Sequence, residues 1–270
     1  MSARRVRVRW VIAAASAVAA LMIVALAVTP VAGSVAASAG RAAAVTSADP
    51  LVQTMVVGKG GRILFGARNL TASATTLSIS GRACAVAGGT ALADLAAIHR
   101  AGGPTFGMRD YGHCGASASS SAELFVYTVG GQTNRGQDGW EYKVDSRSGT
   151  TGAGDPSGPQ GDGRLLQAGD RVLWFWCEAT AGGCQRTMEM DPSSTLVAPG
   201  QSITVAVRGF ENEGRSSAVA GAGLSLGSDI AATGAAGRAQ VRAPRTPGRY
   251  ELSANHRGMV PPFPWAIVVR

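Results

Sequence analysis

The chain has 270 residues, of which 46% are hydrophobic and only 16% are charged, and it holds 37 glycines. This length fits one or two ordinary domains, and the composition favours short strands with many turns over a helical bundle. The formal net charge is +8, but half of it comes from four arginines near the amino terminus, Arg4, Arg5, Arg7 and Arg9. Because no run of basic and aromatic residues follows, nucleic acid is not an expected partner.

The amino-terminal segment predicts export. Its basic residues precede an unbroken apolar run at 10–28, and an A-x-A sequence at 37–39 supplies a cleavage site. Together these features are typical of a signal peptide. The run also just reaches the length that spans a bilayer, so an uncleaved membrane anchor is the alternative interpretation of residues 1–39. In both cases the remaining chain is extracellular or in the cell envelope, and residues 40–50 form a linker.

Four cysteines lie beyond this segment, at Cys84, Cys114, Cys177 and Cys184. An even number in an exported chain predicts two disulfides, for which three pairings exist. Nearness in the sequence favours Cys84 with Cys114 and Cys177 with Cys184. A zinc site needs tighter cysteine pairs or clustered histidines, so no metal is expected.

Short strands are predicted from residue 51 up to Cys84, and one helix follows them. GGTALADLAAIHRAGG at 88–103 predicts this helix, with Thr90 as its N-cap and a glycine at its end. Its apolar positions share one face, so the helix is expected to lie on a sheet. Further strands are predicted at 124–129 and 140–144.

A long loop and an aromatic strand come next. Residues 146–163 are rich in glycine, proline and aspartate and exceed the length that a connection needs, so they are a candidate rim for a binding site. In RVLWFWC at 171–177, alternation places Trp174 and Trp176 on one face and Phe175 on the other. Because both faces are apolar, a central strand covered by the helix on one side is predicted.

Three stretches, ACAVAGGTALADLAAI, GWEYKV and AGDRVLWFW, resemble the transcobalamin-like C-terminal domain family over roughly residues 74–178. The family pattern has an aromatic strand that usually ends in Asn-Gly, which Asp145-Ser146 replaces here. The resemblance implies a β-grasp domain over residues 51–190, with one helix on a mixed sheet. It implies a binding-type fold but no cobalamin site, so no cofactor is expected.

Strands without helices continue over residues 191–270. SITVAVRGF at 202–210 alternates, and TPGRYELSANH follows a glycine turn. These stretches resemble bacterial Ig-like or carboxypeptidase-regulatory-like β-sandwich domains, which commonly act as spacers or adhesion units. PPFPW at 261–265 predicts a proline-bent start of a final edge strand. The expected fold class is therefore α+β followed by all-β.

The aromatic side chains allow two interpretations, a sheet core or a surface that a ligand stacks on. In the second, they form a shallow pocket with the 146–163 loop for a planar or sugar-like ligand. The candidate ligand-binding residues are Trp140, Tyr142, Asp155, Trp174 and Trp176.

Catalytic chemistry is not expected. GLSLG at 223–227 matches G-x-S-x-G, but a turn follows it where a nucleophile elbow needs a helix. Asp155, Asp162 and Asp170 could hold calcium, although their spacing matches no calcium motif, so they are interpreted as solvated loop acids.

The sequence leaves two functional hypotheses. The first is an exported, non-catalytic protein whose partner is a small molecule, a glycan or an envelope protein. The alternative is a purely structural or adhesive envelope protein without a small-molecule site. Exposure of Trp140 and of the 146–163 loop distinguishes them, because a ligand needs an open ring face.

Overall fold

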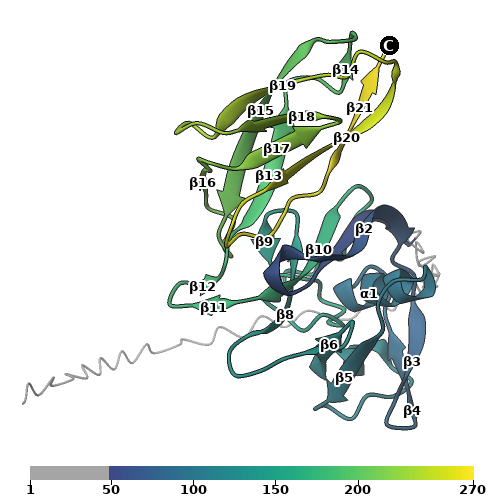
Figure 1. Cartoon of the computed structure of the whole chain (residues 1–270). Coiled ribbons are helices and arrows are strands. Elements are labelled where there is room, and N and C mark those ends of the chain that lie inside the picture. Colours follow the sequence, from purple (N-terminus) through teal and green to yellow (C-terminus); the bar gives the residue numbers. More distant parts are fainter. Residues whose placement is uncertain (1–48) are drawn as a thin grey trace, which may run out of the picture. The chain divides into compact units, whose positions relative to one another are not determined.

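The computed structural model describes residues 49–270, coloured along the sequence in Figure 1. These residues are mostly strands and belong to one compact unit. The predicted signal peptide or anchor at 1–39 and nearly all of the predicted linker at 40–50 lie outside the described residues. Within the described part, no helix is both long and apolar enough to cross a membrane.

The first sheet has five strands in the order β2-β1-β10-β8-β9. β1 (Leu51–Val57) runs parallel to β10 (Arg171–Cys177), and the other pairs, with β2 (Ile63–Thr71), β8 (Gly139–Val144) and β9 (Arg147–Ser148), are antiparallel. β10 is therefore the central strand, as the sequence predicts, and the sheet is mixed.

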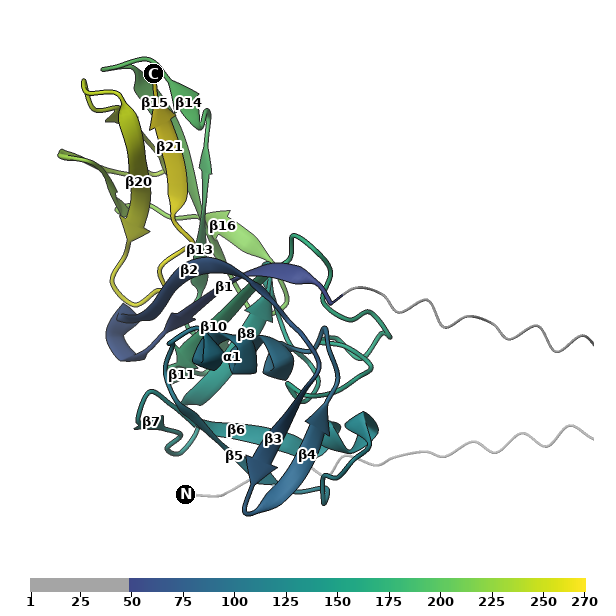
Figure 2. The same cartoon turned by 90° about the vertical axis from the view of Figure 1, so that its right-hand side faces the viewer.

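One helix, α1 (Ala91–Arg100), covers one face of this sheet (Figure 2). The Thr90 side chain accepts a hydrogen bond from Ala93 N at 3.2 Å, which makes Thr90 the predicted N-cap. Leu92, Leu95 and Ile98 are fully buried in the same core as Trp174 and Trp176. The predicted helix on a sheet is thus confirmed.

Smaller elements complete this half of the chain. β3 and β4 form a hairpin, and β5, β6 and β7 form a three-stranded sheet in that order. The turn between β8 and β9 has two residues, and Asp145 adopts a positive φ of 53° there. The bounds are η1 (Lys59–Gly61), β3 (Thr75–Ile79), β4 (Arg82–Val86), β5 (Phe106–Asp110), η2 (Ala118–Glu123), β6 (Leu124–Val129) and β7 (Gln132–Thr133).

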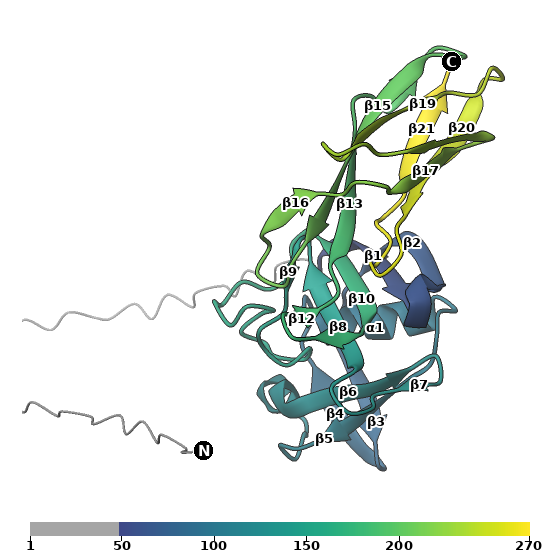
Figure 3. The same cartoon turned by 60° about the vertical axis from the view of Figure 1, so that its left-hand side comes forward.

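Two further sheets enclose a second core. In one, β15 (Ser202–Phe210) pairs with β13, β16 and β19 (Figure 3); the other has the order β14-β21-β20-β17-β18. Alternate residues of β15, such as Ile203 and Val205, point into this core. The remaining bounds are β11 (Ala179–Thr180), β12 (Gly183–Cys184), β13 (Thr187–Pro192), β14 (Leu196–Val197), β16 (Ser216–Ala218), β17 (Gly223–Leu226), β18 (Asp229–Ala232), β19 (Arg238–Arg242), β20 (Gly248–Asn255) and β21 (Trp265–Val269).

The last strand differs from the prediction. β21 is not an edge strand, because β20 pairs with it on one side and the two residues of β14 pair with it, in parallel, on the other. The prediction was wrong because β14 is too short to be recognised as a strand. The predicted boundary between residues 190 and 191 falls inside β13, which pairs along its whole length with β15. The division into two domains stays a prediction.

The second face of the first sheet is covered by residues from the segment between β20 and β21. Val260 and Phe263 pack there against Met55, Leu173 and Phe175. Both faces of β10 are therefore buried, one beneath α1 and the other beneath this segment.

Candidate functional site

The aromatic set lies in the core on the α1 side of the first sheet. In the antiparallel register of β8 and β10, Trp140 is opposite Trp176, with ring centroids 5.9 Å apart, and Tyr142 is opposite Trp174, with centroids 5.3 Å apart. Each of the four side chains is at most 5% exposed. These cross-strand aromatic pairs fill the space between sheet and helix.

The polar atoms at the edge of this core are bound to the chain itself. Trp140 Nε1 donates to the carbonyl oxygen of Gln132 at 2.7 Å, and the Tyr142 hydroxyl donates to that of Thr151 at 3.1 Å. Burial raises the pKa of Tyr142 to about 12. The open ring face that a ligand would need is not found at Trp140, and a ligand-binding role for the four residues stays a prediction.

The 146–163 loop packs against the start of α1. Leu92 N donates to the carbonyl oxygen of Ala153 at 2.7 Å, and Ser121 Oγ donates to that of Gly154 at 2.6 Å. A Cβ on Gly158, whose φ is +92°, would lie 2.0 Å from the carbonyl oxygen of Arg164. The glycines thus allow backbone segments of the loop to approach each other closely. This packing explains the glycine-rich composition of residues 146–163, which is interpreted from the sequence as the rim of a binding site.

The three loop aspartates each bind their own neighbours. Asp155 Oδ1 accepts from Ser157 N at 2.8 Å, and Asp162 Oδ1 accepts from Arg164 N at 3.0 Å. Asp170 is buried and forms an ion pair with Arg164 at 2.7 Å. These carboxylates stabilise turns of the loop, and they do not gather around one point among the described residues.

The serine of the G-x-S-x-G match lies in a strand. Ser225 is in the middle of β17, and its Oγ is 2.7 Å from Ser253 Oγ on the neighbouring β20. β18 follows where a nucleophile elbow would have a helix, so the position does not fit a serine hydrolase.

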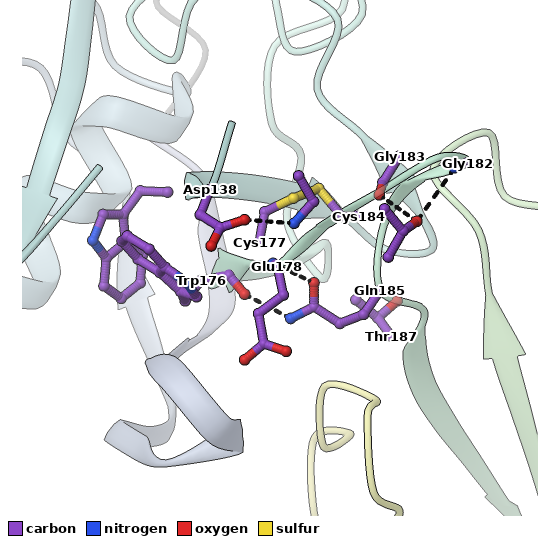
Figure 4. Close-up of a disulfide and its surroundings, with 12 residues drawn as sticks. Asp138, Trp176, Cys177, Glu178, Gly182, Gly183, Cys184, Gln185 and Thr187 are labelled. Atoms are coloured by element: carbon purple, nitrogen blue, oxygen red, sulfur yellow. Dashed lines mark hydrogen bonds between the residues drawn. A yellow bond between two sulfur atoms is a disulfide. The ribbon is translucent and has the colours of Figure 1, made fainter. Parts of the chain in front are cut away.

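Both predicted disulfides are present. Cys177–Cys184 closes a loop at the end of β10 (Figure 4), and Cys84–Cys114 joins β4 to the loop after β5. Beside the first, the Gln185 amide donates to the carbonyl oxygen of Trp176 and accepts from Glu178 N, both at 2.7 Å. The two bonds and the disulfide fix the path of the chain as it leaves the aromatic strand.

Asp110 lies beside the other disulfide. Its carboxylate accepts from Cys114 N at 3.0 Å and is 3.6 Å from the Arg82 guanidinium. The carboxylate and the two sulfurs lie within 4.8 Å of one another, as the ligands of a metal ion would. Metals bind cysteine as the thiolate, and both sulfurs are instead bonded to each other, so this group is structural.

A polar group lies between helix and sheet that the sequence does not predict. Asp94 of α1 is fully buried, and Thr54 of β1 donates to its Oδ2 at 2.9 Å. Its Oδ1 and Trp174 Nε1 have no hydrogen-bond partner among the described residues. Burial raises the pKa of Asp94 to about 7, against the opposing effect of the hydrogen bond from Thr54. An acid in the first helical turn is usually solvated, so the sequence carries no sign of this burial.

The second missed residue is Lys143 of β8, which is completely buried. Its Nζ donates to Thr187 Oγ1 at 3.1 Å and to the carbonyl oxygens of Phe210 and Glu211 at 3.0 and 2.9 Å. All three ammonium protons are thus matched by acceptors from the carboxyl-terminal half. Burial lowers the pKa of Lys143 to about 8.

Comparisons with known proteins add little. No family model matches the chain, and no curated protein matches it. Among solved structures, the chain is similar to the "D00-D0 domain of Intimin", with 15% sequence identity and a TM-score of 0.26; the match covers 54% of this chain and 89% of that chain. A similarity at this TM-score carries no argument about fold or function.

Proposed function

We propose that the chain is an exported, non-catalytic protein of the cell envelope with a structural or adhesive role. The observation that carries the proposal is the burial of Trp140, which is only 5% exposed. A ring on which a ligand stacks needs an open face, whereas an interior ring stabilises a scaffold. The structural or adhesive alternative is therefore favoured over a ligand site built from Trp140 and the 146–163 loop.

Two disulfides support export, because such bonds persist in oxidising compartments. Both close loops within residues 51–190. They therefore support a location of residues 51–190 outside the cytoplasm, whether residues 1–39 are a signal peptide or a membrane anchor.

We further propose a transcobalamin-like β-grasp domain over residues 51–190 and an Ig-like or carboxypeptidase-regulatory-like sandwich over residues 191–270. The sheet order β2-β1-β10-β8-β9, with the parallel pair β1 and β10 in the middle and α1 on one face, supports the first. The two sheets that enclose one all-β core support the second.

The contacts between these two parts support a rigid role. The buried Lys143 donates to the carbonyl oxygens of Phe210 and Glu211 at 3.0 and 2.9 Å, both beyond residue 190. Val260 and Phe263 bury the second face of the first sheet. An interface with an apolar centre and matched polar groups resists relative motion of its two sides.

The test uses the organism that encodes the chain. Labelling of intact cells and of the culture medium is expected to find the protein outside the cytoplasm, with no alkylatable thiols. A deletion strain is expected to lose envelope integrity or surface attachment. A Trp140→Phe variant, which keeps an apolar ring in the core, should restore the lost property in full. A reduced, cytoplasmic protein contradicts the proposal, and so does failure of a folded Trp140→Phe variant to restore the property.

A further inference from the structure

A groove that none of the functional hypotheses uses lies beside Trp265. It has two adjoining hollows of about 630 and 390 Å³, which share Gln53, Pro264, Trp265 and Ala266 in their walls. The larger volume lies within the range of small-ligand sites, about 300–1,000 Å³. Gln53 and Arg171 are paired on β1 and β10, so one wall is the end of the first sheet. Phe263 also lines the larger hollow, with the Arg171 guanidinium over its ring at 5.8 Å.

Trp265 is fixed in place and yet partly open. Its Nε1 donates to the carbonyl oxygen of Met190 at 2.8 Å, which joins β21 to β13 across the sandwich. The side chain is nevertheless 37% exposed, whereas the three other described tryptophans are at most 5% exposed. A ring that is already held in one orientation loses little conformational entropy when a ligand stacks on it.

Polar side chains of both charges surround this ring. Two side chains, Arg171 and Arg249, are donors, three are acceptors, and Gln53 is both; the acceptors are Glu189, Asp191 and Glu251. Two positive and three negative charges do not favour a phosphate or another strongly charged ligand. A hydroxyl group donates one hydrogen bond and accepts others, so a polyhydroxylated ligand can satisfy guanidinium and carboxylate neighbours together.

The groove is less suited to a peptide that adds a strand to a sheet. Such recognition needs a long free strand edge. β1, β10 and β20 are paired on both sides, and β21 lacks a partner on its β14 side only over the three residues 265–267. β13 is an edge strand, but the indole of Trp265 already occupies the Met190 carbonyl.

We propose that this groove binds a carbohydrate. The apolar face of a sugar ring stacks on the Trp265 indole. Its hydroxyls bond to Gln53, Arg171 and Glu189 in the larger hollow and to Arg249 at the rim of the smaller one. The proposal supplies a ligand for the adhesive role, and it rests on the proposed function in that the groove must face the outside of the cell. The ion pair between Arg171 and Glu189, together with the buried Lys143, holds the walls at a fixed separation.

The test applies the purified full chain to a printed array of neutral, acidic and amino-sugar oligosaccharides, followed by calorimetric titration with the sugar that is retained. Trp265→Ala is expected to weaken binding at least about tenfold, the equivalent of about 1.4 kcal/mol. Arg249→Ala, on the exposed rim, is expected to weaken it without disturbing the hydrogen bond of Trp265 to Met190. The matched control is Tyr111→Ala, which removes an aromatic side chain that is 61% exposed outside the groove and should leave binding unchanged.

Three results would overturn the groove as a sugar site. They are retention of no sugar, binding that both groove variants leave unchanged, and a dimer in sedimentation that Trp265→Ala converts to monomer, which would mean that a second copy covers the groove. Failure here is distinct from failure of the proposed function. An exported protein that binds no sugar contradicts only the groove proposal, and a cytoplasmic protein that binds sugar contradicts only the role in the envelope.

Discussion

Lys143 Nζ on β8 lies 2.9 Å from the carbonyl oxygen of Glu211, 68 residues further along the chain. This buried contact joins the first sheet to the sandwich, because its other acceptors, Thr187 and Phe210, also belong to the sandwich strands. The cost of burying an ammonium group is offset only when all its protons are bonded, as they are here.

Removal of this ammonium should therefore destabilise the whole described part. Lys143→Met keeps the length of the side chain but leaves one hydroxyl and two carbonyl groups without their donor, and we expect a loss of about 2–4 kcal/mol in the free energy of unfolding. Urea unfolding measures it. The matched control is Lys59→Met, because Lys59 is exposed and only stacks on Trp176 at 4.1 Å, a contact worth about 1 kcal/mol or less. Equal losses in both variants would contradict the role assigned to Lys143.

Asp94 predicts a pH dependence of stability. Its folded pKa of about 7 lies above its ordinary value of 3.8, so the folded state holds the proton more tightly. The contribution of Asp94 to the free energy of unfolding is greatest below pH 4. It falls as the pH rises to 7, by a total on the order of 4 kcal/mol. In Asp94→Asn this slope is absent, so the variant should gain stability relative to the wild type over the same range.

Urea unfolding between pH 4 and 8 checks this prediction. Asp162→Asn is the control, because Asp162 is exposed in the loop and should follow the wild-type curve. A constant difference between Asp94→Asn and the wild type at every pH would show that Asp94 does not titrate in this range.

The two disulfides should contribute unequally. Cys84–Cys114 spans 30 residues and Cys177–Cys184 spans 7, and loop-closure entropy gives about 3.7 and 2.5 kcal/mol. Paired alanine substitutions of each bridge, compared by thermal unfolding, measure the two effects. A larger loss from the shorter loop would mean that the contacts of Gln185, rather than chain entropy, dominate there.

Fluorescence quenching should separate the tryptophans. In a Trp10→Phe background, acrylamide is expected to quench chiefly Trp265, because Trp140, Trp174 and Trp176 are buried. Adding Trp265→Phe should remove most of the quenchable emission. Strong quenching that remains after this second substitution would mean that a tryptophan of β8 or β10 is exposed to solvent. That result would favour the ligand-binding hypothesis.

The sequence predicted those features that depend on local pattern. The apolar alternation of residues 171–177 placed β10 in the middle of a sheet, and Thr90 before an apolar periodicity marked the start of α1. Cysteine spacing favoured the disulfide pairs that are present. Each of these signals is contained within a few tens of residues.

The remaining features depend on distant partners. Nothing near Lys143 or Asp94 marks them as buried, because their partners lie 40 or more residues away. The sequence also did not decide whether Trp140 is buried, because an aromatic strand can have the same sequence in a core or on a surface. Phe263 lies between prolines that predict a bend, and the chain around it gives no sign of the sheet face that it covers.

Calorimetric unfolding of the full chain tests the central claim, that both halves of the described part form one interlocked scaffold. We predict a single transition whose calorimetric and van't Hoff enthalpies agree for residues 49–270, shifted as a whole to lower temperature by Lys143→Met. Two separate transitions in the wild type, only one of which responds to Lys143→Met, would contradict it.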